Sequence, residues 1–283
     1  MNWSKAKTIL IIALLFANAI LGYFVFRDVE AMGESSDQYL DDKVQELLMR
    51  KEIELGSLIP EKPETIYNLT VEFEKTDPYD INARFFEGRG IREYRKEEGI
   101  EEIYRGTETV ILANGKELIY TNTENPDINN QKLDVVEAES IARNFLEDRG
   151  YSTQDMVLSH SENKNTIYIL EFSKIFDGNY VEMGHTKVTI EGKTVRAMER
   201  LWLNTAEIQQ ADLSVPSASK ALLGLLSIDS AYGKKISRID FCYYFDPEKQ
   251  NVGDLFLQAA QGTALPAWRV QFDDGTKVIL DSE

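Results

Sequence analysis

The sequence predicts an α+β fold in which a single N-terminal transmembrane helix precedes an extracytoplasmic domain of repeated helix-plus-antiparallel-sheet units. The transmembrane helix is predicted by residues 9–26, which carry no charged side chain. As a helix they would span about 27 Å, close to the roughly 30 Å of a hydrocarbon core. The outer units are predicted by segments of helical apolar spacing that are followed by alternating, strand-like segments. Each unit ends in a hairpin, with turns at Asn114-Gly115, Gly192 and Asp274-Gly275.

The charges around the apolar segment predict its orientation. Lys5 and Lys7 precede it, and acidic residues begin only at Asp28. Positive charge on the N-terminal side favours a cytoplasmic N-terminus. We therefore expect a cytoplasmic tail at 1–7, a transmembrane helix at 8–27, and an extracytoplasmic domain held at the cell membrane by this one span.

A cleaved signal peptide is the alternative to an uncleaved anchor. Ala17-Asn18-Ala19 has the small-x-small pattern of a cleavage site. Cleavage there would leave the apolar stretch 20–26 at the new N-terminus, which favours the uncleaved anchor. The sole cysteine, Cys242, lies far from this segment and excludes a lipoprotein signal.

Asn18 is the side chain in the span with the clearest hydrogen-bonding reach. An asparagine in a membrane can bond to a second transmembrane helix, although a single one can also simply be tolerated. Ala13, Ala17 and Gly22 would let another helix approach closely. These four residues are the candidate partner contacts, and self-association through them is a further possibility.

Composition limits the partners of the outer domain. Three of the 31 basic residues lie at or before Arg27 and none of the 48 acidic residues does, so the rest carries a formal charge of about −20. Such a surface repels nucleic acid and anionic lipid headgroups. The hydrophobic content of 43% is enough for a packed core. One cysteine excludes an internal disulfide, which fits a Gram-positive cell surface, and we expect Cys242 to be buried.

The first outer unit is predicted at 28–130. A helix begins near Ser35, a plausible cap, and ends at Gly56. A strand follows around 66–74, where apolar and polar residues alternate, and a hairpin covers 110–120.

The second outer region is predicted at 131–283, with two units at about 131–210 and 211–283. Asp134 and Gly150 have the residue types expected at the start and end of a helix. The remaining elements are a helix at 218–226 and strands at 167–175, 187–190, 194–203, 235–245, 268–272 and 278–280.

No pattern in the sequence indicates catalysis. His160 and His185 are the only histidines, 25 residues apart, and we expect them to be solvated or locally bonded. Acidic clusters occur at 77–80 and 97–102, and paired carboxylates can hydrolyse glycosides when they face a cleft, but nothing in the sequence shows that these do. The spacing of Asp77, Asp80 and Asn82 is not that of an EF-hand loop. The sequence therefore predicts a protein that is not an enzyme and that has no catalytic, cofactor-binding or metal-binding residue.

Both ends of the chain resemble one known family. The opening Met1-Asn2-Trp3-Ser4-Lys5-Ala6-Lys7-Thr8-Ile9 leads directly into the apolar segment, and the C-terminal part contains Leu265-Pro266-Ala267-Trp268-Arg269-Val270. With the length of 283 residues and the predicted outer domain, these features are similar to the YycI (WalI) family.

The resemblance implies an accessory regulator of the WalK (YycG) sensor histidine kinase, which acts with a YycH-like protein in the membrane. Such regulators influence cell-wall metabolism through the response regulator WalR, and their transmembrane helices are implicated in kinase control. The resemblance also implies an α+β outer domain. The sign of the regulation differs among bacteria and does not carry over.

Two other interpretations stay open at this point. The outer domain could be a binding module for a cell-wall fragment or a peptide. It could also be an inhibitor of an outer protease, because helix-plus-antiparallel-sheet units resemble PepSY-type modules.

Overall fold

The computed structural model describes residues 39–95, 99–125, 133–210, 213, 215–249 and 261–281. The predicted cytoplasmic tail and transmembrane helix lie outside these residues. The described chain has a mixed α+β fold made mostly of strands, which join in one open, 14-stranded sheet. Among the helices in these ranges, none is long and apolar enough to cross a membrane.

The helical elements are residues 39–49, α2 (Pro78–Phe86), α3 (Val135–Glu147), α4 (Ala218–Leu222), and the 3₁₀ helices η1 (Leu223–Ser227) and η2 (Asp229–Ala231). The strands are β1 (Glu54–Leu55), β2 (Tyr67–Phe73), β3 (Ile91–Arg95), β4 (Ile100–Arg105), β5 (Glu108–Ala113), β6 (Glu117–Asn122), β7 (Met156–Lys164), β8 (Ile167–Phe176), β9 (Asn179–Glu191), β10 (Thr194–Leu201), β11 (Leu203–Gln210), β12 (Lys235–Tyr244), β13 (Gln261–Phe272) and β14 (Lys277–Asp281).

The strands follow the order β11-β2-β13-β12-β9-β10-β6-β5-β4-β3. β14 adds to β13, and β8 with β7 adds to β9. The pairs are antiparallel apart from β12 with β9 and β1 with β12. β9 is the connecting strand, because it pairs with β12 at its start and with β10 further along.

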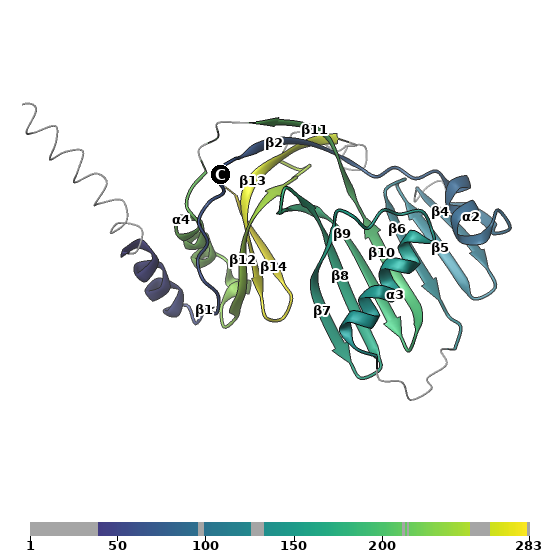
Figure 1. Cartoon of the computed structure of the whole chain (residues 1–283), viewed down its shortest axis with the longest axis horizontal. Helices are drawn as coiled ribbons and strands as arrows, with labels where there is room; N and C mark the ends of the chain where they lie inside the picture. The colour runs from purple at the N-terminus through teal and green to yellow at the C-terminus, as the bar shows by residue number, and fades with distance from the viewer. Residues whose placement is uncertain are drawn as a thin grey trace, which may run out of the picture.

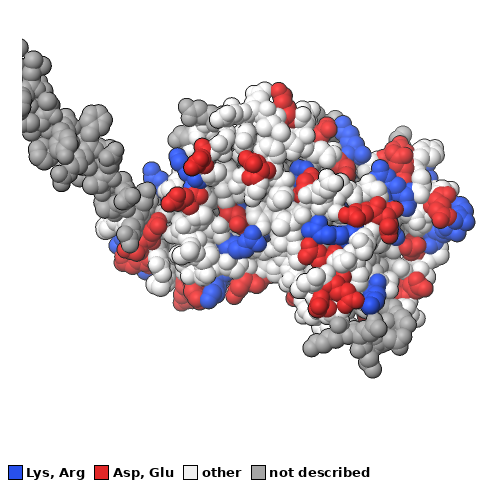
Figure 2. All heavy atoms as spheres, in the orientation of Figure 1, with Lys and Arg blue, Asp and Glu red and all other residues white. Residues whose placement is uncertain are grey.

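Two hydrophobic clusters divide this sheet into two lobes, which lie side by side in Figure 1. Most described residues within 39–73 and 203–281 belong to the terminal lobe, together with Val181 at the start of β9. Most described residues within 78–202 belong to the middle lobe. β2, β11 and β13 run along the top of the arch in this view. Acidic and basic side chains are mixed over both lobes, with a largely uncharged strip between them (Figure 2).

The core of the terminal lobe joins segments from both ends of the described chain. Val44 and Leu48 of the N-terminal helix, Leu69 of β2 and Trp268 and Phe272 of β13 belong to one cluster, each at most 1% exposed. Their burial removes apolar surface from water, which is the main source of stability for such a lobe.

The core of the middle lobe lies between α3 and the sheet. Ala138, Ala142 and Leu146 recur at helical spacing on α3 and are fully buried. They belong to one cluster with Phe172 of β8 and Val188 of β9. α3 therefore covers one face of β8, β9 and β10, as Figure 1 shows.

The division of the chain into units at 28–130, 131–210 and 211–283 stays a prediction. In the described residues, strands from different predicted units pair with each other. β2 pairs with β11 and β13, whereas β6 pairs with β10. Such pairing depends on contacts between distant residues, which local periodicity does not encode.

Several local predictions are confirmed. The Asp134 side chain accepts a hydrogen bond of 2.8 Å from the Glu137 backbone N–H, so it caps α3. Gly150 follows this helix with a positive φ of 75°. The turn at Asn114-Gly115 joins β5 to β6, and its two residues also have positive φ.

Two predicted helices are shorter than expected. The N-terminal helix ends at residue 49, because the chain turns through Glu52 at φ 59° and then pairs as β1 with β12. Gly56 therefore does not cap it. A Cβ there would lie 2.6 Å from the Ile236 carbonyl oxygen, so glycine permits this close approach. The predicted helix at 218–226 is α4, followed by η1.

The acidic cluster at 77–80 is the start of α2, which the sequence analysis missed. The Asp77 side chain accepts a hydrogen bond of 2.7 Å from the Tyr79 backbone N–H, and Pro78 occupies the first turn. An aspartate followed by proline is a helix-start signal, since proline needs no hydrogen-bond acceptor there.

This cap gives a testable expectation. Asp77→Ala should lower the free energy of unfolding by about 1 kcal/mol, because the first turn loses its side-chain acceptor. Asp77→Asn keeps an acceptor and should retain most of the stability. Urea unfolding of the full chain in detergent micelles measures both, and an equal loss in the two variants would contradict the capping role.

Candidate functional site at the junction of the lobes

The predicted partner contacts Ala13, Ala17, Asn18 and Gly22 lie outside the described residues, so their role stays a prediction. The described part of the chain offers a different site. It lies where β9 passes from one lobe to the other and where β12 and β13 approach β7.

β9 is irregular at this crossing. Its register with β8 shifts between Ser173 and Lys174, so residues 182–184 have no partner on β8, although Glu182 still pairs with Tyr244 of β12. Met183 has φ 100°, a conformation that costs free energy for a residue with a side chain. A Cβ on Gly184 would lie 3.1 Å from the Leu203 backbone nitrogen. The strand is therefore bent and closely packed where it leaves β12 and joins β10.

A buried arginine holds this junction together. Arg269 of β13 is fully buried and donates to Glu182 of β9 at 2.7 Å and to Asp240 of β12 at 3.0 Å. Its third nitrogen donates to Gln271 at 2.8 Å. The guanidinium also lies 4.3 Å from the ring centre of Tyr180. Two carboxylates and one amide thus satisfy a charge that would otherwise be very costly to bury.

A second layer of contacts links this network to β7 and β8. The Gln271 amide donates to the Ser159 carbonyl oxygen at 3.1 Å, and the Ser159 hydroxyl donates to the Glu171 carbonyl oxygen at 3.0 Å. Lys277 of β14 forms an ion pair with the Glu171 carboxylate and lies 3.7 Å from the Glu182 carboxylate. Polar contacts therefore connect β13 and β14 to the middle lobe.

Glu171 makes the junction sensitive to acid. Burial raises the pKa of its carboxyl, but the ion pair with Lys277 and the nearby histidines lower it, and the net pKa is below the ordinary 4.5. A carboxyl whose pKa is lowered by folding stabilises the protein above its ordinary pKa. That contribution is lost as the pH falls below about 4.5.

The variant Lys277→Met tests whether the stabilising contribution of Glu171 is lost at low pH. The variant should melt at a lower temperature than the wild type at pH 7, because Glu171 loses its partner. The difference should narrow as the pH falls below about 4.5, where Glu171 becomes protonated in both proteins. Melting curves of the full chain from pH 7 to pH 3 measure it, and a constant difference over that range would contradict the expectation.

A hollow of about 440 Å³ opens beside this network. It is lined by Leu158, Ser159, His160, Ser161, Ser237, Arg238, Gln271, Phe272 and Asp273, which come from β7, β12, β13 and the turn after β13. Gly275 packs on the His160 ring, where a Cβ would lie only 2.5 Å from its Nε2. The hollow therefore lies between the two lobes and has both polar and apolar lining residues.

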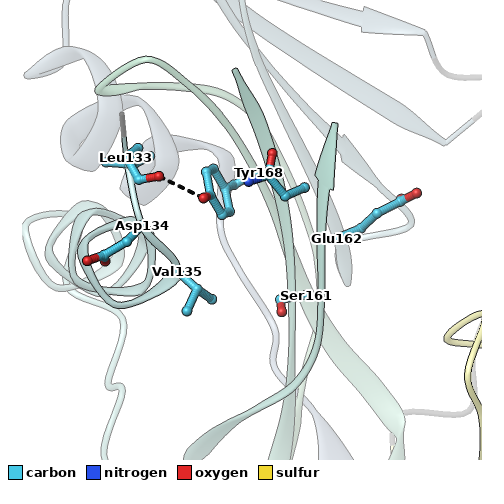
Figure 3. A pocket seen from close by; sticks show the side chains of 7 residues that line it. Leu133, Asp134, Val135, Ser161, Glu162 and Tyr168 are labelled. Atoms are coloured by element: carbon cyan, nitrogen blue, oxygen red, sulfur yellow. Dashed lines mark hydrogen bonds between the residues drawn. The ribbon is translucent and has the colours of Figure 1, made fainter. Parts of the chain in front are cut away.

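A second hollow of about 380 Å³ lies between α3 and β7. Leu133, Val135, Ser161 and Tyr168 are among its lining residues, and Figure 3 shows Val135 and Ser161 bordering the same space. The Tyr168 hydroxyl donates to the Leu133 carbonyl oxygen at 2.7 Å, which ties the start of α3 to β8. The two hollows share Ser161, so they meet at β7.

The predicted roles of the cysteine and the histidines can be compared with this geometry. Cys242 is fully buried as expected, and burial raises the pKa of its thiol. His185 lies 3.4 Å from the Glu199 carboxylate, a local contact. In the ranges that the structure describes, no group of three or more histidine, cysteine, aspartate or glutamate residues could hold a metal ion.

Sequence reasoning did not identify Arg269, Gln271 or Glu182 as a site. One signal was present, since an arginine and a glutamine alternate with Trp268, Val270 and Phe272 in a strand of otherwise apolar residues. Alternation places both polar side chains on one face of the strand. Their acidic partners come from β9 and β12, which the sequence alone did not bring together.

Comparisons with solved structures find distant likenesses. No family model and no curated protein matches the chain. One similar solved structure is an uncharacterized protein from Eubacterium rectale, at 10% identity and a TM-score of 0.47, covering 81% of this chain and 84% of the other. Another is the C-terminal domain of Bacillus megaterium YpeB, at 11% identity and a TM-score of 0.38, covering 74% and 94%.

Proposed function

We propose that this protein is a non-enzymatic, membrane-anchored regulator that modulates a WalK-like sensor histidine kinase together with a YycH-like partner, and so affects cell-wall homeostasis. One observation carries the proposal. The YycI-like opening from Trp3 to Ile9 leads directly into the uncharged residues up to Phe26. It implies a single span with the C-terminal domain outside the cell.

A single predicted span is compatible with regulation by contact. A message would cross by contact between transmembrane helices, or by outer-domain contacts that move the helix. A coupling free energy of about 1–3 kcal/mol between the contact and the kinase would change its activity several-fold or more.

The start of the described chain supports a route from the outer domain to the anchor. Val44 and Leu48 of the helical residues 39–49 are fully buried in the terminal lobe. Asp41 accepts a hydrogen bond from the Ser219 hydroxyl at the start of α4. A displacement of this lobe would therefore move the helix that follows the predicted span.

Membrane co-purification from the native host tests the proposal. The protein carries a C-terminal tag, and a matched variant has residues 8–27 replaced by an unrelated transmembrane span. We expect the wild type to bring down a histidine kinase and a YycH-like protein, and the span variant to lose the kinase.

The outcomes separate the parts of this proposal. Retention of the kinase by the span variant would place the kinase contact in the outer domain and overturn the transmembrane route. Absence of a kinase from both samples would overturn the regulator function. In that case, the next step is a search for ligands of the outer domain.

A further inference from the structure

We propose that the outer edge of β7 binds an extended peptide segment of another protein, with an apolar side chain on one face and basic side chains on the other. This site is separate from the predicted membrane span and does not require kinase regulation. It uses the hollow between α3 and β7 and the hollow at the lobe junction as pockets for alternate side chains of the peptide.

β7 offers a strand edge that can pair. Within the described chain eight of its nine residues pair with β8 alone, and Ser159 lies at a register shift between the two strands. Alternate backbone N–H and C=O groups of such an edge strand point away from its partner. The Ser159 carbonyl points toward β13, because it accepts the hydrogen bond from the Gln271 side chain. An extended peptide would bond to the remaining groups as an added strand.

The side of β7 that faces α3 suits an apolar side chain. Leu133, Val135 and Tyr168 line the hollow on this side, and Val135 is 39% exposed. Figure 3 shows that Val135 projects toward β7, while the ring of Tyr168 borders the same space. A branched aliphatic side chain of the peptide would cover Val135 and remove its apolar surface from water.

The opposite side of β7 suits a basic side chain. Figure 3 shows Glu162 on the side of β7 away from Val135. Asp273 lines the hollow between the lobes and is exposed. Arg238 in this lining lies 3.4 Å from the Asp240 carboxylate, which also accepts a bond from Arg269. Asp273 is the acid of this lining that a basic peptide side chain would meet.

The apolar hollow and the acidic side chains lie on opposite sides of β7, which suits the alternating side chains of a bound peptide strand. Successive side chains of a peptide strand point to opposite faces, so one face would enter the apolar hollow while the other meets Glu162 and Asp273. Lys164 pairs with Glu162 at 2.9 Å and would be displaced by a peptide lysine. The formal net charge of −17 would also attract a cationic peptide over longer distances.

Fluorescence anisotropy with the full chain in detergent micelles tests this site. The probe is a labelled heptapeptide of alternating lysine and valine, with blocked ends. The double variant Glu162→Lys/Asp273→Lys should bind it at least about tenfold more weakly than the wild type. Glu207→Lys is the matched control, because Glu207 is an exposed acid on another edge strand, β11, and should change affinity less than about twofold.

Two further measurements keep the test decisive. The double variant should gain affinity for a glutamate–valine heptapeptide, a gain that a misfolded protein would not show. The lysine–valine peptide can be N-methylated at alternate residues in two ways, and each version lacks N–H donors along one edge. One of these two peptides should lose binding, because the edge that pairs with β7 then lacks its donors. Unchanged binding by the double variant, an equal loss in Glu207→Lys, or full binding by both N-methylated peptides would overturn the proposal. None of these readings depends on a kinase.

Discussion

Arg269→Ala should lower the free energy of unfolding by about 3–5 kcal/mol, because it leaves Glu182 buried without its main partner. The Glu182 side chain is 8% exposed and the Arg269 side chain is fully buried. Asp240 and Gln271 would also lose a bond each. Removing one member of a buried ion pair costs more than the pair contributes, since the remaining charge stays out of water.

Thermal unfolding of the full chain in detergent micelles measures this loss through the fluorescence of the buried Trp202 and Trp268. Arg89→Ala is the matched control, because the Arg89 side chain is 60% exposed in its pair with Glu87. It should change stability by less than about 1 kcal/mol. Adding Glu182→Ala to Arg269→Ala should recover part of the loss. A loss no larger than that of the control would show that the network contributes little.

Trp268→Ala is expected to have an effect of similar size, about 3–5 kcal/mol. Trp268 is 1% exposed, its ring packs edge-on against Phe241 at 5.5 Å between centres, and its indole N–H donates to the Pro216 carbonyl oxygen at 2.9 Å. Alanine would leave a large cavity in the terminal lobe and an unsatisfied carbonyl. For an outer domain of this size the melting temperature should fall by about 6–20 °C.

Trp268→Phe separates the two contributions. It keeps an aromatic ring in the core but removes the donor to Pro216, so it should cost about 1–3 kcal/mol. Differential scanning calorimetry of the wild type and both variants compares the two losses. If the alanine and phenylalanine variants melt together, the hydrogen bond and not the packing would hold the tryptophan in place.

Trp268 and Arg269 are adjacent, yet they stabilise different parts of the molecule. Successive side chains of a strand point to opposite faces. Trp268 therefore enters the hydrophobic cluster of the terminal lobe, and Arg269 enters the ionic network at the lobe junction. The stretch Pro266-Ala267-Trp268-Arg269, which carried part of the family resemblance, thus has a structural role on both faces of β13.

The sequence by itself determined the elements whose signals are local. Asp134 caps α3 through a bond to a residue three positions away, and Gly150 follows the same helix with positive φ. Asn114-Gly115 fixes the β5–β6 turn through its own backbone conformation. These features depend on interactions within a few residues, so their patterns are visible in the chain.

Only the tertiary structure decided which elements lie together. Glu182 and Arg269 are 87 positions apart, and the pairing of β2 with β13 joins residues from near the two ends of the described chain. The hollows beside β7 likewise combine residues from α3, β7, β8, β12 and β13. Such contacts follow from strand register and from which faces pack together, and many registers share the same alternation of residues. The elements could therefore be predicted from local physics, whereas the site required the whole fold.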